Sequence, residues 1–415
     1  MDPLTIILAV FIFTALYFQV FLLVTYLENR AGFSRVNFKN KKSNPADLPS
    51  ATIIVPCWNE EKTVAKTLSS LLSLQYPKDK LFILVVDDGS TDNTAAAVKP
   101  FLSDPRVKYF YKENGGKHTA LNFGIEFAKT DLVGCLDADS FVSKTALLAI
   151  VEEFKNQEVM AVTPAIKVDE PKTIIQRVQE TEYTLGLILR KLLASLNAQY
   201  VAPGPFSIYR QTIFGTIGNF KSAHNTEDME MAMRMKMHKM KIGNAFNAEV
   251  YTNTPTTLRV LIRQRLRWTY GFIQNAMDYK FMIFRKKYGN IGIFSMPAAF
   301  ISLITALYII FYAARGLILF LQEKITYLSI VGLAGLSPSL RFDWFFVNTE
   351  MVTLLLYFSI AIFLGFLALS IYHARGGFIF KKSDLYYVFL YGFIAPLWIL
   401  RTATQLILRR PTRWK

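Results

Sequence analysis

The sequence predicts an α/β domain with a mostly parallel sheet, helices on both of its faces, and transmembrane α-helices on either side. Two observations predict this fold class. From about residue 51 to residue 290, short apolar runs typical of buried strands alternate with segments of helical periodicity. Such strand–helix–strand repetition with short links favours a parallel sheet covered on both faces. Before and after it, long apolar runs reach the roughly 20 residues that a bilayer-spanning helix needs.

Three long runs carry no charged residue: 3–27, 294–314 and 351–372. The run 385–400 is shorter and continues past Arg401, so we expect a span with a polar interruption there. The run 325–340 holds two glycines and a proline, which favours a re-entrant or interfacial segment. The sequence therefore indicates an integral, multi-pass membrane protein.

The first run predicts a retained anchor. It lacks a basic segment before it and exceeds the apolar length of a secretory signal peptide. Asp2 precedes the run, whereas five basic residues follow it within residues 30–42. By the positive-inside rule, residue 28 onward lies in the cytoplasm. We therefore expect a protein of the plasma (inner) membrane with its soluble domain on the cytoplasmic side.

The chain is basic, with a formal net charge of +16. Cytoplasmic loops of membrane proteins are rich in Lys and Arg, which attract anionic lipid and anionic substrates. The sequence has no zinc-finger spacing and no basic zipper, so nucleic acid is not an expected partner. Cys57 and Cys135 each follow an apolar run, and we expect two buried, reduced thiols.

Polar residues follow each of four predicted strands, which span 51–56, 81–88, 107–111 and 131–139. They are Asn59 and Glu60, Asp87 and Asp88, the stretch "ENGGK" ending at Lys117, and Asp137 with Asp139. In open α/β sheets, ligands bind outside the carboxyl ends of the strands. Each motif alone is also an ordinary turn, but four at one sheet edge indicate a binding site.

The residue types at this edge indicate the ligand. The sequence has no dinucleotide fingerprint and no P-loop. Asp137 and Asp139, one residue apart, suit a hard divalent cation such as Mg²⁺ or Mn²⁺. That cation would hold a diphosphate, and Lys117 at a helix start would add positive charge. Asp88 is placed to accept hydrogen bonds from a base or ribose. The pattern predicts a metal-bound nucleoside diphosphate.

The segment 224–240 holds six of the protein's 12 methionines. Thioether sulfurs would suit Cu(I), so a metal site is one interpretation. On a helix, however, Met229, Met233 and Met237 share one face, while Met231 and Met235 lie on another. Methionine fills irregular core gaps well. We therefore expect a packing helix that carries the acidic pair at its start.

Six motifs in order resemble the series found in processive, membrane-embedded family-2 glycosyltransferases. They are "TIIVPCWNE", "VVDDGSTD", "GGKHTALN", "CLDADS", "NTEDMEM" and "QRLRW". That group includes the synthases of cellulose, chitin, hyaluronan and poly-N-acetylglucosamine, and the resemblance covers roughly residues 51–270. It implies a GT-A-type nucleotide-sugar-binding domain.

The resemblance also implies a role for each motif residue. The UDP-sugar would be bound by Asp88, Lys117, Asp137, Asp139, Gln264 and Arg267, with Asp88 on the uracil side. Asp139 and Asp137 would hold Mg²⁺ or Mn²⁺. The T-E-D triplet places the general base at Asp228, beside Glu227. Thr226 and Trp268 would bind the acceptor, the indole face stacking on a pyranose.

The predicted organisation then has five parts. They are an anchor over 1–27, a basic linker over 28–50, a cytoplasmic GT-A-like catalytic domain over 51–255, an amphipathic interfacial segment with the Q-x-x-R-W motif over 256–290, and transmembrane helices over 291–415. Three crossings after the catalytic domain would put the basic tail 409–415 outside, against the positive-inside rule. Either one hydrophobic stretch does not cross, or residues 325–340 help to form a fourth crossing.

The resulting expectation is an inverting, metal-dependent hexosyltransferase. It would add sugar from a UDP-sugar to a growing β-linked polysaccharide, coupled to translocation across the bilayer. The T-E-D triplet is closer to the cellulose and poly-N-acetylglucosamine synthases, while "GPFSIYR" (204–210) is similar to the hyaluronan and chitooligosaccharide synthases. The short chain without added regulatory domains favours UDP-N-acetylglucosamine. The sequence leaves an accessory membrane subunit open.

Three other interpretations remain. A non-processive enzyme would load one sugar onto a polyprenyl phosphate or other lipid acceptor, and product length distinguishes it. A glycoside hydrolase also uses paired carboxylates, but would need neither UDP-sugar nor metal. A non-enzymatic glycan export component would need no base such as Asp228.

Overall fold

The computed structural model describes residues 2–33, 44–332 and 350–408. Three sequence predictions therefore lie partly or wholly outside the described residues. They concern the middle of the basic linker (34–43), the end of the re-entrant segment (333–340) and the basic tail (409–415).

An eight-stranded sheet forms the centre of the soluble part, in the order β3-β2-β1-β4-β7-β6-β8-β5. Its strands are β1 (Ala51–Cys57), β2 (Leu81–Asp88), β3 (Val107–Lys112), β4 (Leu132–Cys135), β5 (Ser140–Val142), β6 (Val159–Val168), β7 (Ser207–Arg210) and β8 (Lys241–Thr252). β7 is antiparallel to both of its neighbours and β5 is antiparallel to β8, while the remaining pairs are parallel. The predicted mostly parallel sheet is confirmed.

Helices cover both faces of this sheet because side chains along each strand alternate. In β1, Ile53 and Val55 face a core shared with α2 (Val64–Leu72) and α5 (Ala146–Glu153). Ile54 faces the opposite core, shared with α4 (Lys117–Phe127), α7 (Thr212–Ile217) and α8 (Glu227–Met237). A short helix α3 (Thr94–Val98) follows β2. Burial on both faces explains why the strands read as continuous apolar runs.

The methionine-rich helix α8 is packed between two apolar clusters, as the alternation predicts. Met231 and Met235 pack with the sheet-side cluster. Met229 and Met233 pack with residues of α9 (Leu258–Asp278) and the start of α10 (Met296–Val331). All four are 8% exposed or less. The methionines therefore fix α8, and with it the acidic pair at its first turn, between the sheet and α9.

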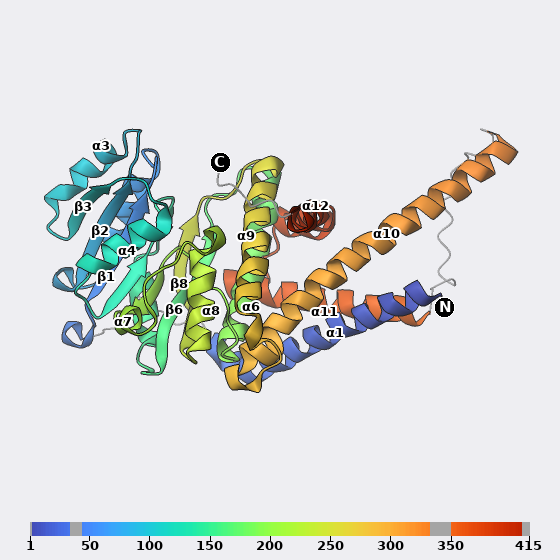
Figure 1. The fold of residues 1–415 in the computed structure, drawn as a ribbon, viewed down its shortest axis with the longest axis horizontal. Coiled ribbons are helices and arrows are strands. Elements are labelled where there is room, and N and C mark those ends of the chain that lie inside the picture. Colours follow the sequence, from blue (N-terminus) through green and yellow to red (C-terminus); the bar gives the residue numbers. More distant parts are fainter. Residues whose placement is uncertain (1, 34–43, 333–349, 409–415) are drawn as a thin grey trace.

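Among the residues that the structure describes, four helices are long and apolar enough to cross a membrane: α1 (Pro3–Asn29), the segment 291–331 that contains α10, α11 (Met351–Arg375) and α12 (Lys382–Ile407). The predicted run 294–314 continues in one helix to Val331, so residues 325–331 are not a separate segment. α1 and α10 run antiparallel, because Phe18 packs on Phe294 while Thr5 bonds Tyr312. In Figure 1, α1, α10 and α11 extend away from the sheet on one side of the molecule.

Two further helices, α6 (Ile174–Ser195) and α9, lie between the sheet and these long helices (Figure 1). α6 begins with a capping box formed by Thr173 and Gln176. α9 carries the Q-x-x-R-W motif and ends at Asp278, after which the chain continues in short turns at Lys280–Met282 and Lys286–Tyr288. Both helices thus connect the soluble part to the apolar helices.

Candidate active site

Three of the predicted polar loops converge where the parallel strands end. Asp88 ends β2, and both of its carboxylate oxygens are used by the loop after β3. The Gly115 and Gly116 amides donate to Asp88 over 3.1 and 2.8 Å, and Lys112 lies 2.6 Å from Oδ1. Asp88 is only 3% exposed. Any nucleotide contact at Asp88 would therefore have to share these oxygens with the loop.

This loop in turn positions Lys117. Gly116 has φ of 90°, a conformation that glycine adopts without strain, and α4 begins at the next residue. Lys117 Nζ lies 2.6 Å from Asp137 Oδ1 and 3.3 Å from Glu227 Oε1. Burial alone would lower the pKa of Lys117, but the carboxylates of Asp137 and Glu227 outweigh it and raise the pKa well above its usual value. Lys117 is thus a fixed cation that joins two of the predicted motifs.

The structure adds Gly204, which the sequence indicated only as part of a motif similar to certain synthases. Its amide donates to Asp228 Oδ2 over 3.2 Å. A Cβ at this position would lie 2.7 Å from Lys117 Nζ and 3.2 Å from the Asp137 carboxylate. No side chain larger than hydrogen fits between these groups without displacing them. The signal in the sequence was a glycine just before β7, the strand that pairs with β4.

The two acidic residues at the start of α8, Glu227 and Asp228, have pKa values that are shifted in opposite directions. Burial, with the charge of Glu227, raises the pKa of Asp228 to about 6, against the opposing effect of Lys117 and Arg267. Burial would also raise the pKa of Glu227, but Lys117 outweighs it and lowers that pKa. The Met229 amide donates to Asp228 Oδ1 over 2.8 Å. Asp228 is therefore the better proton acceptor of the two near neutral pH.

Asp139 lies near two other acidic side chains, Asp137 and Glu60. Burial, together with the charges of Asp137 and Glu60, raises its pKa to about 7. Ser140 donates to its Oδ1 over 3.0 Å. Within residues 2–33, 44–332 and 350–408, no three His, Cys, Asp or Glu side chains are arranged to hold a metal ion by themselves. A cation at Asp137 and Asp139 would need further oxygen ligands from elsewhere.

Thr226 is buried just before the start of α8. Its side chain is buried at 3% exposure, donates to Ala223 O over 3.0 Å and accepts from Asn275 Nδ2 over 2.8 Å. A Cβ on Gly271 would lie 2.5 Å from Thr226 Cγ2. Its hydroxyl is occupied by these two bonds and covered by α9, so Thr226 positions the start of α8, and its contact with an acceptor stays a prediction. Asn275 and Gly271 were not singled out in the sequence.

The residues of the Q-x-x-R-W motif on α9 contribute unequally to the site. Arg267 Nη1 donates to Asn225 O over 2.8 Å, which ties α9 to the segment just before the acidic pair. The Arg265 guanidinium lies 4.3 Å from the centre of the Trp268 ring and 2.6 Å from Glu182 on α6. Gln264 accepts from Arg265 over 3.3 Å. Arg267 thus reaches the site directly, while Trp268 is oriented by its neighbour.

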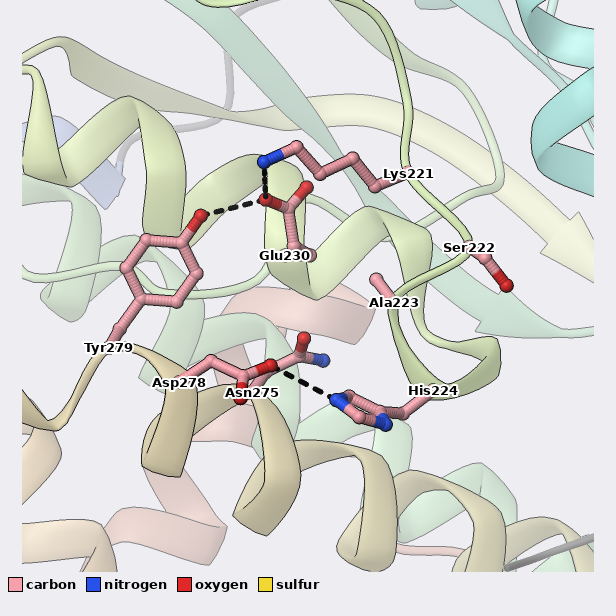
Figure 2. Close-up of a pocket in the computed structure, with 8 residues that line it drawn as sticks. All are labelled: Lys221, Ser222, Ala223, His224, Glu230, Asn275, Asp278 and Tyr279. Carbon is pink, nitrogen blue, oxygen red and sulfur yellow. Dashed lines mark hydrogen bonds and ion pairs between the residues drawn. The ribbon is translucent and has the colours of Figure 1, made fainter.

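The loop before α8 is held in an unusual conformation. Ala223, His224 and Asn225 all have left-handed backbones, with φ of 40°, 54° and 62°. Each such residue costs on the order of 1 kcal/mol. A cavity of about 540 Å³ lies between this loop, α8 and α9. Figure 2 shows the residues that line it. His224 pairs with Asp278 at 3.0 Å, and Lys221 lies 3.8 Å from Glu230. These contacts hold the loop that sets the direction of Glu227 and Asp228.

Comparisons with known proteins agree with this geometry. Residues 52–218 match Glycosyl transferase family 2. A poly-β-1,6-N-acetyl-D-glucosamine synthase of Staphylococcus epidermidis is 30% identical over 266 residues, which are 63% of this chain and 63% of that protein. A synthase of the same name from Staphylococcus aureus (strain COL) is 30% identical over the same shares. The match thus spans less than two thirds of these relatives' own length.

A solved structure matches nearly the whole chain. It is the mannosyltransferase PcManGT from Pyrobaculum calidifontis, in complex with GDP-Man and Mn²⁺. The two chains share 18% identity with a TM-score of 0.63, covering 98% of this chain and 99% of that one. At this identity the likeness concerns the fold, and it confirms the predicted GT-A-like arrangement flanked by long helices. Residues 52–218, which hold β2 to β7 and all but the first residue of β1, are thus similar to a glycosyl transferase family 2 domain.

Proposed function

We propose that the protein is an inverting glycosyltransferase that transfers N-acetylglucosamine from its UDP derivative to a growing β-linked polysaccharide. The observation that carries the proposal is the contact of Lys117 with both Asp137 and Glu227, beside Asp228 with its pKa of about 6. This contact holds Lys117, the cation proposed to bind phosphate, next to the proposed base Asp228. The name of the staphylococcal relatives supports the sugar and suggests a β-1,6 linkage to test.

Asp228 would act as the general base. Its oxygen Oδ2 takes the proton from an acceptor hydroxyl as that oxygen attacks the anomeric carbon from the side opposite UDP. One such displacement inverts the anomeric configuration. A positioned base of this kind contributes typically 10²- to 10⁴-fold. Burial supports the role because it offsets the nearby cations, which would otherwise keep the carboxylate weakly basic.

The departing UDP gains negative charge, and cationic groups would stabilise it. Lys117 and Arg267 are the protein's own contribution, since both act electrostatically on the acidic pair. Asp137 and Asp139 fit a divalent cation. Burial, together with the carboxylates of Asp137 and Glu60, raises the pKa of Asp139 to about 7, and hard cations prefer such oxygen ligands. Asp137 and Asp139 would hold Mg²⁺ or Mn²⁺, which would supply positive charge to neutralise the diphosphate.

We place the protein in the plasma (inner) membrane with its catalytic domain in the cytoplasm. Four helices of suitable length and the positive charge after α1 support this location. A catalytic site tied through α9 to the apolar helices would allow the polymer to enter the bilayer as it grows. The lipid bilayer and the polysaccharide are thus the proposed partners.

Product analysis tests the proposal. Purified protein in detergent is incubated with UDP-N-acetylglucosamine and Mg²⁺ or Mn²⁺, and the products are separated by length. We expect a polymer of many sugars that appears only with the metal. A product with one sugar on an added polyprenyl phosphate would instead support the lipid-acceptor alternative and contradict polymer synthesis.

A further inference from the structure

The last helix, α12, packs mainly on two helices of the soluble part, α6 and α9, whereas α1 packs on both α10 and α11. This packing extends from the start of α12 to Trp398. Tyr387, Ile394 and Trp398 are buried in a cluster with Val178 of α6 and Leu261 of α9. In Figure 1, α12 is seen end-on beside α9, while α1, α10 and α11 run across the page. Its axis therefore lies across those of the three other helices.

Polar contacts fix the start of α12 at the end of α11. Arg375, the last residue of α11, forms two bonds of 2.6 and 2.8 Å with Asp384, which is 4% exposed. Thr181 of α6 donates to the same carboxylate over 2.8 Å, and Tyr391 donates to Glu182 over 3.3 Å. These contacts join α12 to a charged helix of the soluble part over two turns.

The two helices beneath α12 cannot enter the hydrocarbon core. α6 carries the charged residues Arg177, Glu180, Glu182, Arg190 and Lys191, and α9 carries Arg259, Arg263, Arg265 and Arg267. From Asp384 to Trp398, a length of about 21 Å at 1.5 Å per residue, α12 packs against α6 and crosses α9. A helix held to their level over that length has too little left to cross a core about 30 Å thick.

The face of α12 turned away from the protein is apolar. Leu385, Phe389, Phe393, Leu397 and Leu400 recur every three or four residues, so they form one stripe along the helix. Each is exposed, from 44% at Leu397 to 78% at Phe393. Such a stripe needs an apolar partner. Because α11 delivers the chain to the membrane surface at Arg375, the partner in reach is the lipid of that same leaflet.

We propose that α12 does not cross the membrane but lies in its inner surface, with one face on α6 and α9 and the Leu385–Leu400 stripe in the lipid. This rests on the proposal that α1, α10 and α11 span the bilayer. Two crossings then follow the catalytic domain instead of three. The basic segment 409–415 is left on the cytoplasmic side, as the positive-inside rule requires. The long apolar composition of α12 reflects two apolar contacts, not a transmembrane path.

A depth profile tests this in the full-length protein in vesicles of phosphatidylcholine and phosphatidylglycerol. Single substitutions Leu385→Cys, Phe389→Cys, Phe393→Cys and Leu397→Cys are labelled with a nitroxide, and lipid depth is measured by electron paramagnetic resonance. The native Cys57 and Cys135 are buried. Matched labels at Leu354, Phe358 and Leu364 on α11, all exposed, provide the reference for a crossing helix.

We expect one shallow depth along α12 and a depth that passes through a maximum along α11. A maximum near Phe393 equal to that of α11 would overturn the proposal, as would labels on α12 that contact only water. A flat profile on α11 would overturn it too, by removing its premise. A tag after Lys415 should be digested by protease on the same side as the catalytic domain, and digestion from the opposite side would contradict the proposal. Neither readout depends on sugar transfer.

Discussion

The backbone amide of Gly204 donates to Asp228 Oδ2 over 3.2 Å, which joins the segment before β7 to the proposed base. The same glycine leaves room for the Lys117–Asp137 pair. One small residue therefore lies beside three charged side chains from different parts of the chain. We therefore expect the site to be sensitive to substitution at this position, although glycine has no reactive side chain.

Gly204→Ala should reduce the rate of UDP release by about 10²-fold, because its Cβ would displace Lys117 and the Asp137 carboxylate. Gly215→Ala on α7 is the control, since a Cβ there meets nothing within 4 Å. Steady-state kinetics of both variants, with folding checked by thermal unfolding, make the comparison. Equal activity in the two variants would contradict the role of Gly204.

Gly271→Ala should lower the turnover number while leaving UDP affinity nearly unchanged. The new Cβ would lie 2.5 Å from Thr226 Cγ2 and so move the residue that precedes the acidic pair. Gly365→Ala on α11 has open space around its Cβ and should retain activity. UDP affinity is measured by calorimetry and turnover by UDP release. A loss confined to UDP affinity would show that α9 acts on donor binding rather than on Asp228.

The pH profile of turnover should have its acidic limb near pH 6. Asp228 must be ionised to accept a proton, and burial raises its pKa to about 6. Lys117 opposes this rise, so Lys117→Gln should move the limb to higher pH in addition to reducing the rate. Lys129→Gln, an exposed residue of the same region, should leave the limb in place. A limb near pH 4 in the parent protein would contradict the burial of the base.

The raised pKa of Asp228 also predicts how the stability of the Asp228→Asn variant depends on pH. In the fold the pKa of Asp228 is raised above the ordinary value of 3.8, so its ionisation destabilises the native state as pH rises through about 6. Asp228→Asn should therefore raise the apparent unfolding temperature at pH 8, with the difference vanishing near pH 4. Thermal scans in detergent at both pH values measure it. A lower unfolding temperature at pH 8 would contradict this assignment.

Divalent metal should bind more weakly in acid. The pKa of Asp139 is about 7 before metal binds, and a protonated carboxyl is a poor ligand. The apparent affinity for Mn²⁺ in the presence of UDP should fall by about tenfold from pH 8 to pH 6. Electron paramagnetic resonance of free Mn²⁺ measures this, with the exposed Asp79→Asn as control. Asp139→Asn should weaken binding and remove most of its pH dependence.

The parts of the site that the sequence could predict are those that local patterns encode. Asp137 and Asp139 follow an apolar strand, and Asp228 opens a helix, so the residues next to them in the sequence are enough to predict where they lie in the fold. Gly204 and Asn275 act through contacts between distant elements, which no local pattern reveals. Thr226 was predicted to bind the acceptor as part of the T-E-D triplet, and its burial beneath α9 could not be predicted from that motif.

The fold, too, could be predicted from the sequence only in part. Alternating apolar runs predicted the sheet and its two covered faces, because burial on both sides leaves a continuous apolar strand. Hydropathy also marks α12 as long and apolar, but it does not distinguish lipid from protein as the apolar neighbour. Only the packing of Tyr387 and Trp398 on α6 and α9 makes that distinction.

The most direct test of the central claim is UDP release by the purified protein against a panel of UDP-sugars, beside Asp228→Asn. We expect turnover with UDP-N-acetylglucosamine and Mg²⁺ or Mn²⁺, reduced by roughly 10²- to 10⁴-fold in the variant. Thermal unfolding of Asp228→Asn is the control that distinguishes loss of the catalytic base from loss of folding. UDP release that is unchanged by Asp228→Asn would contradict the assignment of the base and, with it, the proposed mechanism.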